Sequence, residues 1–354
     1  MDDIDLSIFR WMYPGGEMSP WGTDPRITPS EIASHVGRDR TVVWDRIRKW
    51  KRKGFWNGFD VRLNLRTLGI GQVRAELHVA DSAEGWALFD QLGQADGILE
   101  ARVVFGDTMT SRDVEVVVVE MAAESPAHVA RRMRILRQLS PTGSVEGPFS
   151  EEAPPIAREL TPLDWRIVAA IVAYPNASQS RLAHLVGVTL NTFVHHHSAL
   201  IDDHAVFYAP KVDWSQLGCV TFAVHCNDVA AVDRARKSFE ARFPHSIPMN
   251  LKGFEGMSAE WRNPTTFAII VPVRSPSEVQ TLVRDLSTVS GVRLVRPEYW
   301  GPGRRFPTWV IQRIGERLAI PAGVARAQVL RAGGRKSRGR VIPTARKEFE
   351  LASR

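Results

Sequence analysis

An internal duplication is the feature that most limits what this chain can fold into. Two stretches, residues 4–69 and 163–218, align with apolar positions, an acid and turn glycines in register. The matched pairs are Asp5 with Asp164, Ile8 with Ile167, Val36-Gly37 with Val186-Gly187, and Leu68-Gly69 with Leu217-Gly218. The repeat distance of about 150 residues is far beyond the roughly 20–50 residues of solenoid repeats. The sequence therefore predicts two large related copies in one chain.

The first part of each copy predicts three short helices followed by a hairpin-like tail. In the first copy, residues 30–36 have the pattern of the second helix, with a small residue, Ala33, where two helices cross closely. Gly37 permits a tight turn, and Asp39 is a good N-cap for the helix that follows. This is the order of a helix-turn-helix, and residues 55–65 are expected to form its wing.

The second part of each copy predicts strand-helix-strand-strand-helix-strand. The expected strands are 72–79, 98–105, 114–120 and 144–148 in the first copy, and 221–226, 247–254, 267–273 and 292–299 in the second. The expected helices are 83–92, 126–139, 229–243 and 276–287. This order predicts a ferredoxin-like (βαββαβ) module, an antiparallel sheet with helices on one face. The predicted class is α+β.

Five regions follow from these patterns. Residues 1–70 are expected to form a DNA-reading winged helix-turn-helix, and residues 71–150 a ferredoxin-like ligand or dimerisation module. A linker and a degenerate second winged helix-turn-helix occupy 151–218, and a second ferredoxin-like module occupies 219–300. Residues 301–354 predict a basic tail with one amphipathic helix over 308–318, followed by a disordered Gly- and Arg-rich segment.

The positive charge is concentrated in two places. The 354-residue chain has a net charge of +7, yet residues 301–354 hold 13 Arg or Lys against three Glu, and residues 38–53 hold eight against two Asp. The remaining sequence is acidic, so a localised contact with a polyanion is expected. The apolar runs are strand-sized and the N-terminus has no basic-then-apolar signal, which predicts a cytoplasmic protein without a membrane contact.

The helix expected over 40–53 has two chemically different sides. Val43, Ile47 and Trp50 recur at i, i+4 and i+7 and are expected in the core. The remaining positions form the expected DNA contact set: Arg38, Arg40, Thr41, Trp44, Asp45, Arg46, Arg48, Lys49, Lys51, Arg52 and Lys53. Within it, residues 40–48 can reach base edges and residues 49–53 can reach phosphates. The alternative is a solvated basic face that only complements the helix dipole.

The corresponding helix of the second copy lacks these cations. Residues 190–203 contain no Arg or Lys and end in two Asp, so only Asn191 and His195 remain to read a base. A structural role without DNA contact is therefore expected. Consecutive helical side chains point about 100° apart, so His195, His196 and His197 cannot converge on one metal ion. No metal and no cofactor are expected.

The chain resembles the Lrp/AsnC (feast/famine) transcription regulators. The resemblance is carried by Asp5, Ile8, Ile32-Ala33, Val36-Gly37, Arg46-Ile47, Gly54-Phe55, Leu63-Asn64-Leu65 and Leu68-Gly69. It implies a regulator that binds double-stranded DNA, whose C-terminal modules pair through their sheets and often bind small effectors. The family's ligand loop corresponds to Phe105-Gly106-Asp107, so Gly106 and Asp107, with Trp261 and Arg262 of the second copy, are the expected ligand-binding residues.

Two other functions compete with this one. Siroheme decarboxylases are similar in build and carry a His-Cys-Tyr stretch followed by Arg in the middle strands of the module. The corresponding stretches here, 101–106 and 248–254, contain no histidine, and His225-Cys226 lies in a different strand. A regulator that is not an enzyme is therefore expected. A nucleoid-associated protein without sequence preference is the third possibility, and it would use the tail and the basic helix.

The two copies also predict how the protein assembles. Residues 72–148 and 219–299 are expected to pair within one chain as a pseudo-dimer with one basic reading helix. Because a palindrome needs two reading helices, two chains are expected to associate as a homodimer or larger assembly. The helix over 308–318 and the second winged helix are the expected contact surfaces between chains.

Overall fold

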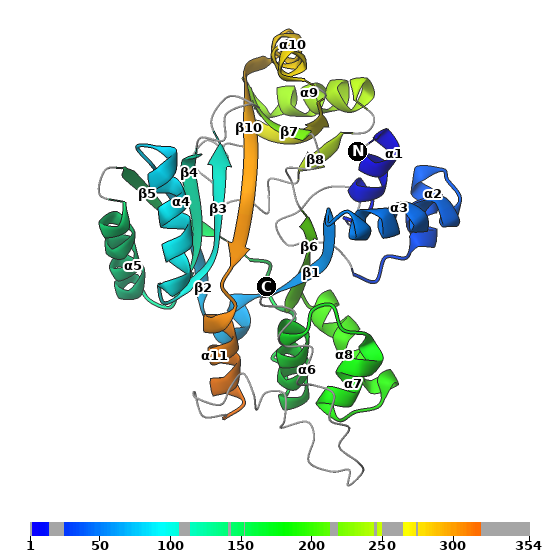
Figure 1. The fold of residues 1–354 in the computed structure, drawn as a ribbon, viewed down its shortest axis with the longest axis vertical. Coiled ribbons are helices and arrows are strands. Elements are labelled where there is room, and N and C mark those ends of the chain that lie inside the picture. Colours follow the sequence, from blue (N-terminus) through cyan, green and yellow to red (C-terminus); the bar gives the residue numbers. More distant parts are fainter. Residues whose placement is uncertain are drawn as a thin grey trace.

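The computed structural model describes residues 2–13, 25–105, 114–140, 143–151, 153–212, 219–243, 246–249, 265–273 and 275–319 (Figure 1). The fold is mixed α/β and its strands pair antiparallel, in agreement with the expected class. None of the described helices combines the length and the apolar composition needed to cross a membrane.

Two groups of three helices form as the sequence predicts. The first helical trio consists of α1 (Asp3–Arg10), α2 (Pro29–Val36) and α3 (Arg40–Arg52), followed by β1 (Trp56–Leu63) and the short helix η2 (Leu65–Leu68). The second helical trio consists of α6 (Pro162–Ala173), α7 (Gln179–Val186) and α8 (Leu190–Asp202), followed by β6 (Val206–Val212). Figure 1 shows the two trios on the same side of the molecule, joined by β1 and β6.

The hairpin expected after each trio is wrong. β1 pairs antiparallel with β6, from Trp56 opposite Val212 to Leu63 opposite Val206, so the two strands form a two-stranded sheet between the halves. The physical reason is that each strand finds a complementary edge in the other half. The predicted wing is therefore a shared ribbon that connects the two trios.

The other described strands form one eight-stranded sheet in the order β5-β2-β4-β3-β10-β7-β9-β8. The first sheet half contains β2 (Gly71–His78), α4 (Ser82–Gln91), η3 (Leu92–Gln94), β3 (Ile98–Phe105), β4 (Val114–Ala123), α5 (Pro126–Leu139) and β5 (Ser144–Glu151). The second sheet half contains β7 (Cys219–Cys226), α9 (Val229–Arg242), β8 (Ile247–Met249), β9 (Thr266–Pro272), α10 (Pro276–Ser287) and β10 (Val292–Arg305). Both halves thus have the strand and helix order read from the sequence.

The long strand β10 joins the two halves. Its first part pairs with β7, and its second part, from Tyr299 to Arg305, pairs with β3 across an irregularity after Trp300. The expectation that the strand ends at residue 299 and that a tail begins at 301 is therefore wrong. Because the free edges of β3 and β10 satisfy each other's backbone groups, the two sheets pair within one chain, as predicted.

Each helical trio packs against the sheet half of the other copy. The core of the first trio, which includes Leu6 and Phe9, continues into Ala223, Ile247 and Ile270 of the second sheet half. Arg10 of α1 also donates from Nη1 to the carbonyl oxygen of Ser246 at 3.3 Å. The core of the second trio continues into η2 and into Ala122 of β4. The outer faces of the sheet halves have their own cores, under α4 and α5 and under α9 and α10.

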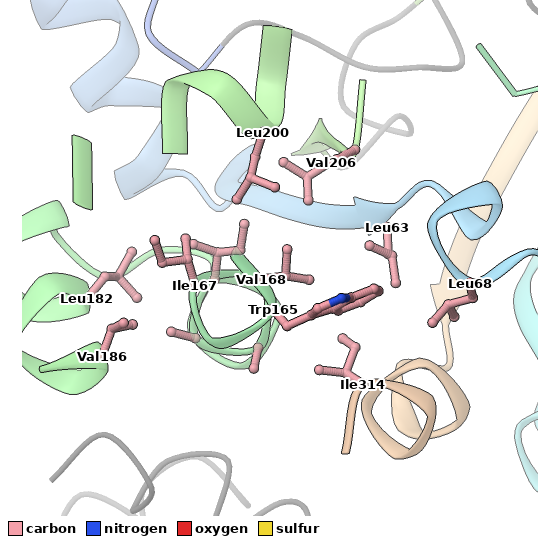
Figure 2. Packing of buried hydrophobic residues seen from close by; sticks show 14 of the residues in the cluster. Leu63, Leu68, Trp165, Ile167, Val168, Leu182, Val186, Leu200, Val206 and Ile314 are labelled. Atoms are coloured by element: carbon pink, nitrogen blue, oxygen red, sulfur yellow. The ribbon is translucent and has the colours of Figure 1, made fainter. Parts of the chain in front are cut away.

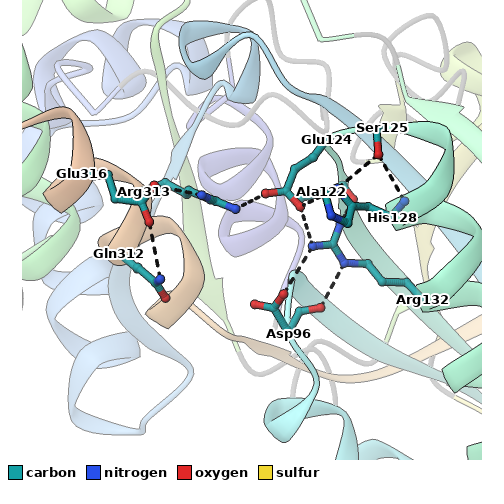
Figure 3. Close-up of polar contacts among 9 residues, drawn as sticks. All are labelled: Asp96, Ala122, Glu124, Ser125, His128, Arg132, Gln312, Arg313 and Glu316. Atoms are coloured by element: carbon teal, nitrogen blue, oxygen red, sulfur yellow. Dashed lines mark hydrogen bonds and ion pairs between the residues drawn. The ribbon is translucent and has the colours of Figure 1, made fainter. Parts of the chain in front are cut away.

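The helix expected in the tail forms as α11 (Thr308–Arg317) and packs within the chain. Trp309 and Ile314 are buried against the second trio, and Figure 2 shows Trp165 of α6 between Ile314 and Leu63 of β1. Figure 3 shows Arg313 paired with Glu124, which also accepts from Arg132 of α5 at 2.9 Å. The apolar face of α11 is therefore buried, and the expectation that it joins two chains is wrong.

Candidate nucleic-acid interface

Residues close in the sequence define the start of α2, its end and the start of α3. Thr28 and Glu31 form a reciprocal capping box at the start of α2, and α2 ends at Gly37, whose φ of 64° is left-handed. Asp39 then caps α3 by accepting from the backbone N–H of Thr41 at 2.7 Å. The turn between the two helices is thus set by a glycine conformation and an N-cap, both of which the sequence predicts.

The apolar face of α3 is buried as predicted. Val43, Ile47 and Trp50 are 0%, 4% and 3% exposed and lie in the core of the first trio. The indole N–H of Trp50 donates to Asp5 Oδ1 at 3.1 Å, so its polar atom is satisfied. These contacts hold α3 in one orientation on α1 and leave the opposite face to solvent.

Arg46 differs from the other cations of the helix. Its Nη1 lies 2.6 Å from Asp2 Oδ1 and 3.0 Å from Asp5 Oδ1, and its side chain is 24% exposed. The hydrogen bond to Asp2 raises the pKa of the Arg46 guanidinium further. Arg46 thus binds α3 to the N-cap of α1. The second copy has the same kind of pair, because His196 Nδ1 lies 2.7 Å from Asp164 Oδ1.

The other predicted DNA-contact residues lie on exposed positions of α3 and its flanks. Within the described chain, Arg38, Arg40, Lys49, Arg52 and Lys53 have no ion pair with an acid. Lys51 lies over the Trp56 ring, with Nζ 4.9 Å from the ring centroid, and stays exposed. The surface of α3 therefore presents cations that the fold itself does not neutralise.

An aromatic and charged cluster lies near the middle of this surface. The guanidinium of Arg48 lies 5.1 Å from the centroid of Trp44, which is 41% exposed. Asp45 is 4.0 Å from Arg48 Nη1, and both side chains are more than half exposed. An exposed pair at this distance is weak, so Arg48 can exchange Asp45 for another acceptor at little cost.

A shallow groove runs along the same face. It has a volume of about 830 Å³, and most of its lining comes from the predicted contact residues, from Asp45 to Arg52. Val42, 40% exposed, also lines it. The contact set expected from the sequence does not include Val42, although Val42 directly follows Arg40 and Thr41 on the exposed side of α3.

The equivalent helix α8 presents different chemistry. Leu190 and Val194 are exposed where α3 has Arg40 and Trp44, and Asn191 and His195 are exposed beside them. At its C-terminal end, Asp202 pairs with Arg26 at 2.8 Å and Asp203 pairs with Arg158 at 2.7 Å. The face of α8 is apolar and acidic where that of α3 is basic.

The three histidines of α8 point to different partners. His196 pairs with Asp164, and the buried His197 lies 2.6 Å from the Tyr208 hydroxyl. Burial raises the pKa of Tyr208. Burial also tends to raise the pKa of Asp164, but hydrogen bonds from Arg158 and His196 hold it well below its usual value. The three imidazoles do not form one ligand set.

The predicted ligand-binding residues lie outside the described residues. These are Gly106, Asp107, Trp261 and Arg262. The described groups that come nearest to a cation-binding set are Glu76, His78 and Glu146, but Glu76 is already paired with Arg74 at 2.8 Å.

No family model and no curated protein matches the chain, but solved structures do. A siroheme decarboxylase, NirDL, in complex with an iron-uroporphyrin III analogue, covers 89% of this chain and 100% of its own at 12% identity and a TM-score of 0.45. The leucine response regulatory protein LrpA of Mycobacterium tuberculosis covers 41% of this chain and 92% of its own, at 18% identity and a TM-score of 0.28. AsnC of E. coli covers 45% and 97%, at 15% identity and a TM-score of 0.29.

The match to NirDL corrects one expectation. The sequence interpretation excluded an enzyme because residues 101–106 and 248–254 contain no histidine. Structures of an enzyme, however, extend over both halves of this chain, whereas the Lrp and AsnC regulators each cover less than half. The expectation that this chain is not an enzyme therefore does not stand.

Proposed function

We propose that this protein binds double-stranded DNA through α3 and acts as a transcription regulator of the Lrp/AsnC type, with two copies of a helix-turn-helix trio and a ferredoxin-like module in one chain. The observation that carries the proposal is the exposed face of α3. This N-capped second helix of the helix-turn-helix carries cations that have no acidic partner among the described residues. A helix of this kind fits the major groove of B-DNA, where arginine reads guanine and lysine neutralises phosphate.

The chemistry of α3 divides into two parts under this proposal. Arg40, Trp44 and Arg48 lie within the first nine residues of α3, in the part where a recognition helix meets base edges. Lys49, Arg52 and Lys53 lie toward the C-terminal end and contact the phosphate backbone. Arg46 is left out of the contact set, because Asp2 and Asp5 already hold it.

Selection of bound duplexes from a random pool tests the proposal. Wild-type protein is expected to enrich a defined sequence, and Arg40→Ala is expected to lose that enrichment. Asn191→Ala in α8 is the matched control, because it removes an exposed polar residue from the equivalent helix without changing a cation. A pool that shows no enrichment, or equal enrichment by wild type and Arg40→Ala, refutes sequence-specific reading by α3.

Under this proposal each chain supplies one basic recognition helix, α3, and this has a consequence for assembly. A specific site usually buries roughly 1,000–2,500 Å² of protein surface, more than one recognition helix supplies. We therefore propose that two chains bind one operator, with half-sites separated by one or more turns of about 10 base pairs. Light scattering on the complex with the selected duplex checks this: a mass of one chain per site contradicts it.

Catalysis is the second candidate function. The siroheme decarboxylase NirDL covers 89% of this chain, which makes catalysis worth testing. Anaerobic incubation with siroheme, followed by absorption spectroscopy and mass analysis of the tetrapyrrole, tests it directly. Loss of carboxylate mass from siroheme assigns the activity, whereas an unchanged tetrapyrrole spectrum and mass remove it.

A further inference from the structure

One apolar side chain lies exposed within the charged face of α3. Val42 is 40% exposed and lines the groove along this helix, together with residues such as Asp45, Lys49 and Arg52. Among the described residues, it packs into none of the four hydrophobic cores, whereas the neighbouring Val43 is fully buried. Packing of the trio therefore does not explain an apolar residue at position 42.

The position of Val42 on the helix is that of a base-contacting residue. Val42 is the third residue of α3, in the first turn, where a recognition helix meets base edges. Asp45 and Lys49 follow at i+3 and i+7, so the three side chains lie on one side of the helix. Lys49 has no ion pair with an acid among the described residues. A phosphate contact by Lys49 would therefore turn this side of α3, and Val42 with it, toward the DNA.

The major groove offers an exposed valine one well-suited partner. Base edges there present hydrogen-bond donors and acceptors, together with the 5-methyl group of thymine. A donor or acceptor that faces Val42 loses its hydrogen bond to water without gaining another, which is costly. The thymine methyl group has no such bond to lose, and its contact with Val42 removes apolar surface from water. The side chain of Val42 therefore favours thymine at the position that it contacts.

We propose that Val42 contacts the 5-methyl group of a thymine in the bound site and thereby selects that base. This contact presupposes DNA binding by α3, as proposed above. It adds a base preference that Arg40 and Arg48 cannot supply, because guanidinium groups select guanine. Burial of about one methyl group corresponds to a roughly fourfold gain in affinity.

Deoxyuridine tests this contact, because it differs from thymidine only in lacking that methyl group and pairs with adenine in the same way. In the duplex selected by wild-type protein, each thymidine is replaced in turn by deoxyuridine, and fluorescence anisotropy measures the affinity of the full chain. Wild type is expected to bind one of these duplexes about fourfold more weakly, whereas Val42→Ala is expected to bind that duplex and the parent duplex equally. Val229→Ala is the matched control: Val229 of α9 is 56% exposed, and this variant should keep the fourfold difference.

Val42→Ala replaces an exposed residue by a stronger helix former, so the variant is expected to fold, which circular dichroism checks. A wild-type protein that binds its selected duplex without loss at any deoxyuridine overturns the thymine contact, and so does a selected sequence that contains no thymine. A fourfold loss that persists in Val42→Ala overturns it as well, because the methyl group then contacts another side chain. These results leave DNA binding by α3 intact, whereas a protein that selects no duplex fails both proposals.

Discussion

Changing Arg46 or Arg48 of α3 to alanine is expected to affect different properties, stability in one case and DNA affinity in the other. Arg46 is 24% exposed and reaches Asp2 and Asp5, whereas Arg48 is 61% exposed and lies 4.0 Å from Asp45. Arg46→Ala should therefore lower the free energy of unfolding and leave sequence choice unchanged. Arg48→Ala should leave stability unchanged and lower affinity for the selected duplex.

The magnitudes follow from these contacts. Hydrogen bonds between charged groups contribute about 1.5–3 kcal/mol when shielded from water. Because Asp2 is 57% exposed, a discount for solvent brings the expected cost of Arg46→Ala to about 1–2 kcal/mol. The exposed pair of Arg48 contributes at most about 0–1 kcal/mol to stability. Loss of a base contact costs about 1–3 kcal/mol of binding, which is roughly a 5- to 150-fold weaker affinity.

Urea unfolding and fluorescence anisotropy on the same protein samples measure both quantities. Affinity of Arg46→Ala must be measured at a temperature at which the variant is fully folded, so that lost stability is not mistaken for a lost contact. A tenfold weaker affinity for folded Arg46→Ala, together with unchanged stability, would refute the assignment of Arg46 to the α1 contact. Equal affinities of Arg48→Ala and wild type would refute base reading by Arg48.

Three further changes have defined outcomes. Asp164→Asn should lower the free energy of unfolding by about 1.5–3 kcal/mol at pH 7, because it weakens the charged hydrogen bonds to the half-buried Arg158 and His196. Hydrogen bonds hold the folded-state pKa of Asp164 well below 3.8, so this stabilisation is fully present above pH 3.8 and is lost only as the pH falls through the folded value. Urea unfolding should therefore show a smaller difference between wild type and Asp164→Asn at pH 3 than at pH 7. Ile314→Ala should cost about 2–5 kcal/mol, because the side chain is 1% exposed between α11 and α6, whereas Gln312→Ala on the exposed face should change stability by less than about 0.5 kcal/mol in the same titration. Lys49→Gln should weaken all duplexes alike and reduce the slope of log affinity against log salt by about 1, and a change confined to the selected sequence would contradict a phosphate contact.

Helices α2 and α3 could be predicted because the residues that define them are close together in the sequence. Val43, Ile47 and Trp50 repeat with the helical period, and all three are buried. Gly37 and Asp39 supply the left-handed turn and the N-cap through contacts within four residues of themselves. Such features depend on neighbouring residues alone, so a single sequence contains all the information that they need.

The connections between the halves could not be predicted, because strand partners are not encoded in a strand's own pattern. β1 was expected to fold back into a hairpin, yet its partner β6 lies about 150 residues away. Residues 301–305 were expected to begin a basic tail, yet they extend β10 onto β3. An unpaired edge is satisfied by whichever strand the global fold brings beside it.

The internal duplication, and not the helical period, distinguishes the structural cation of α3 from those that can contact DNA. The period places Arg46 between the buried and exposed faces, where its role stays open. The alignment resolves it, since Asp5 matches Asp164 and Arg46 matches His196, and each pair forms the same contact between the first and third helix of its trio. An acid and a base that recur together in both copies indicate a contact within the fold.

The second helical trio supports the fold even though α8 lacks cations, because each trio packs against the sheet half of the other copy. The first trio rests on Ala223, Ile247 and Ile270 of the second sheet half, and β1 needs β6 as its partner. Loss of the second copy would therefore remove the support of the basic reader. Among the exposed residues of α8, Asp202 adds to that support through its ion pair with Arg26, whereas the core contacts come from the buried residues Phe193, His197 and Leu200. The fold therefore needs these positions, and it does not require a cation at Leu190, the counterpart of Arg40.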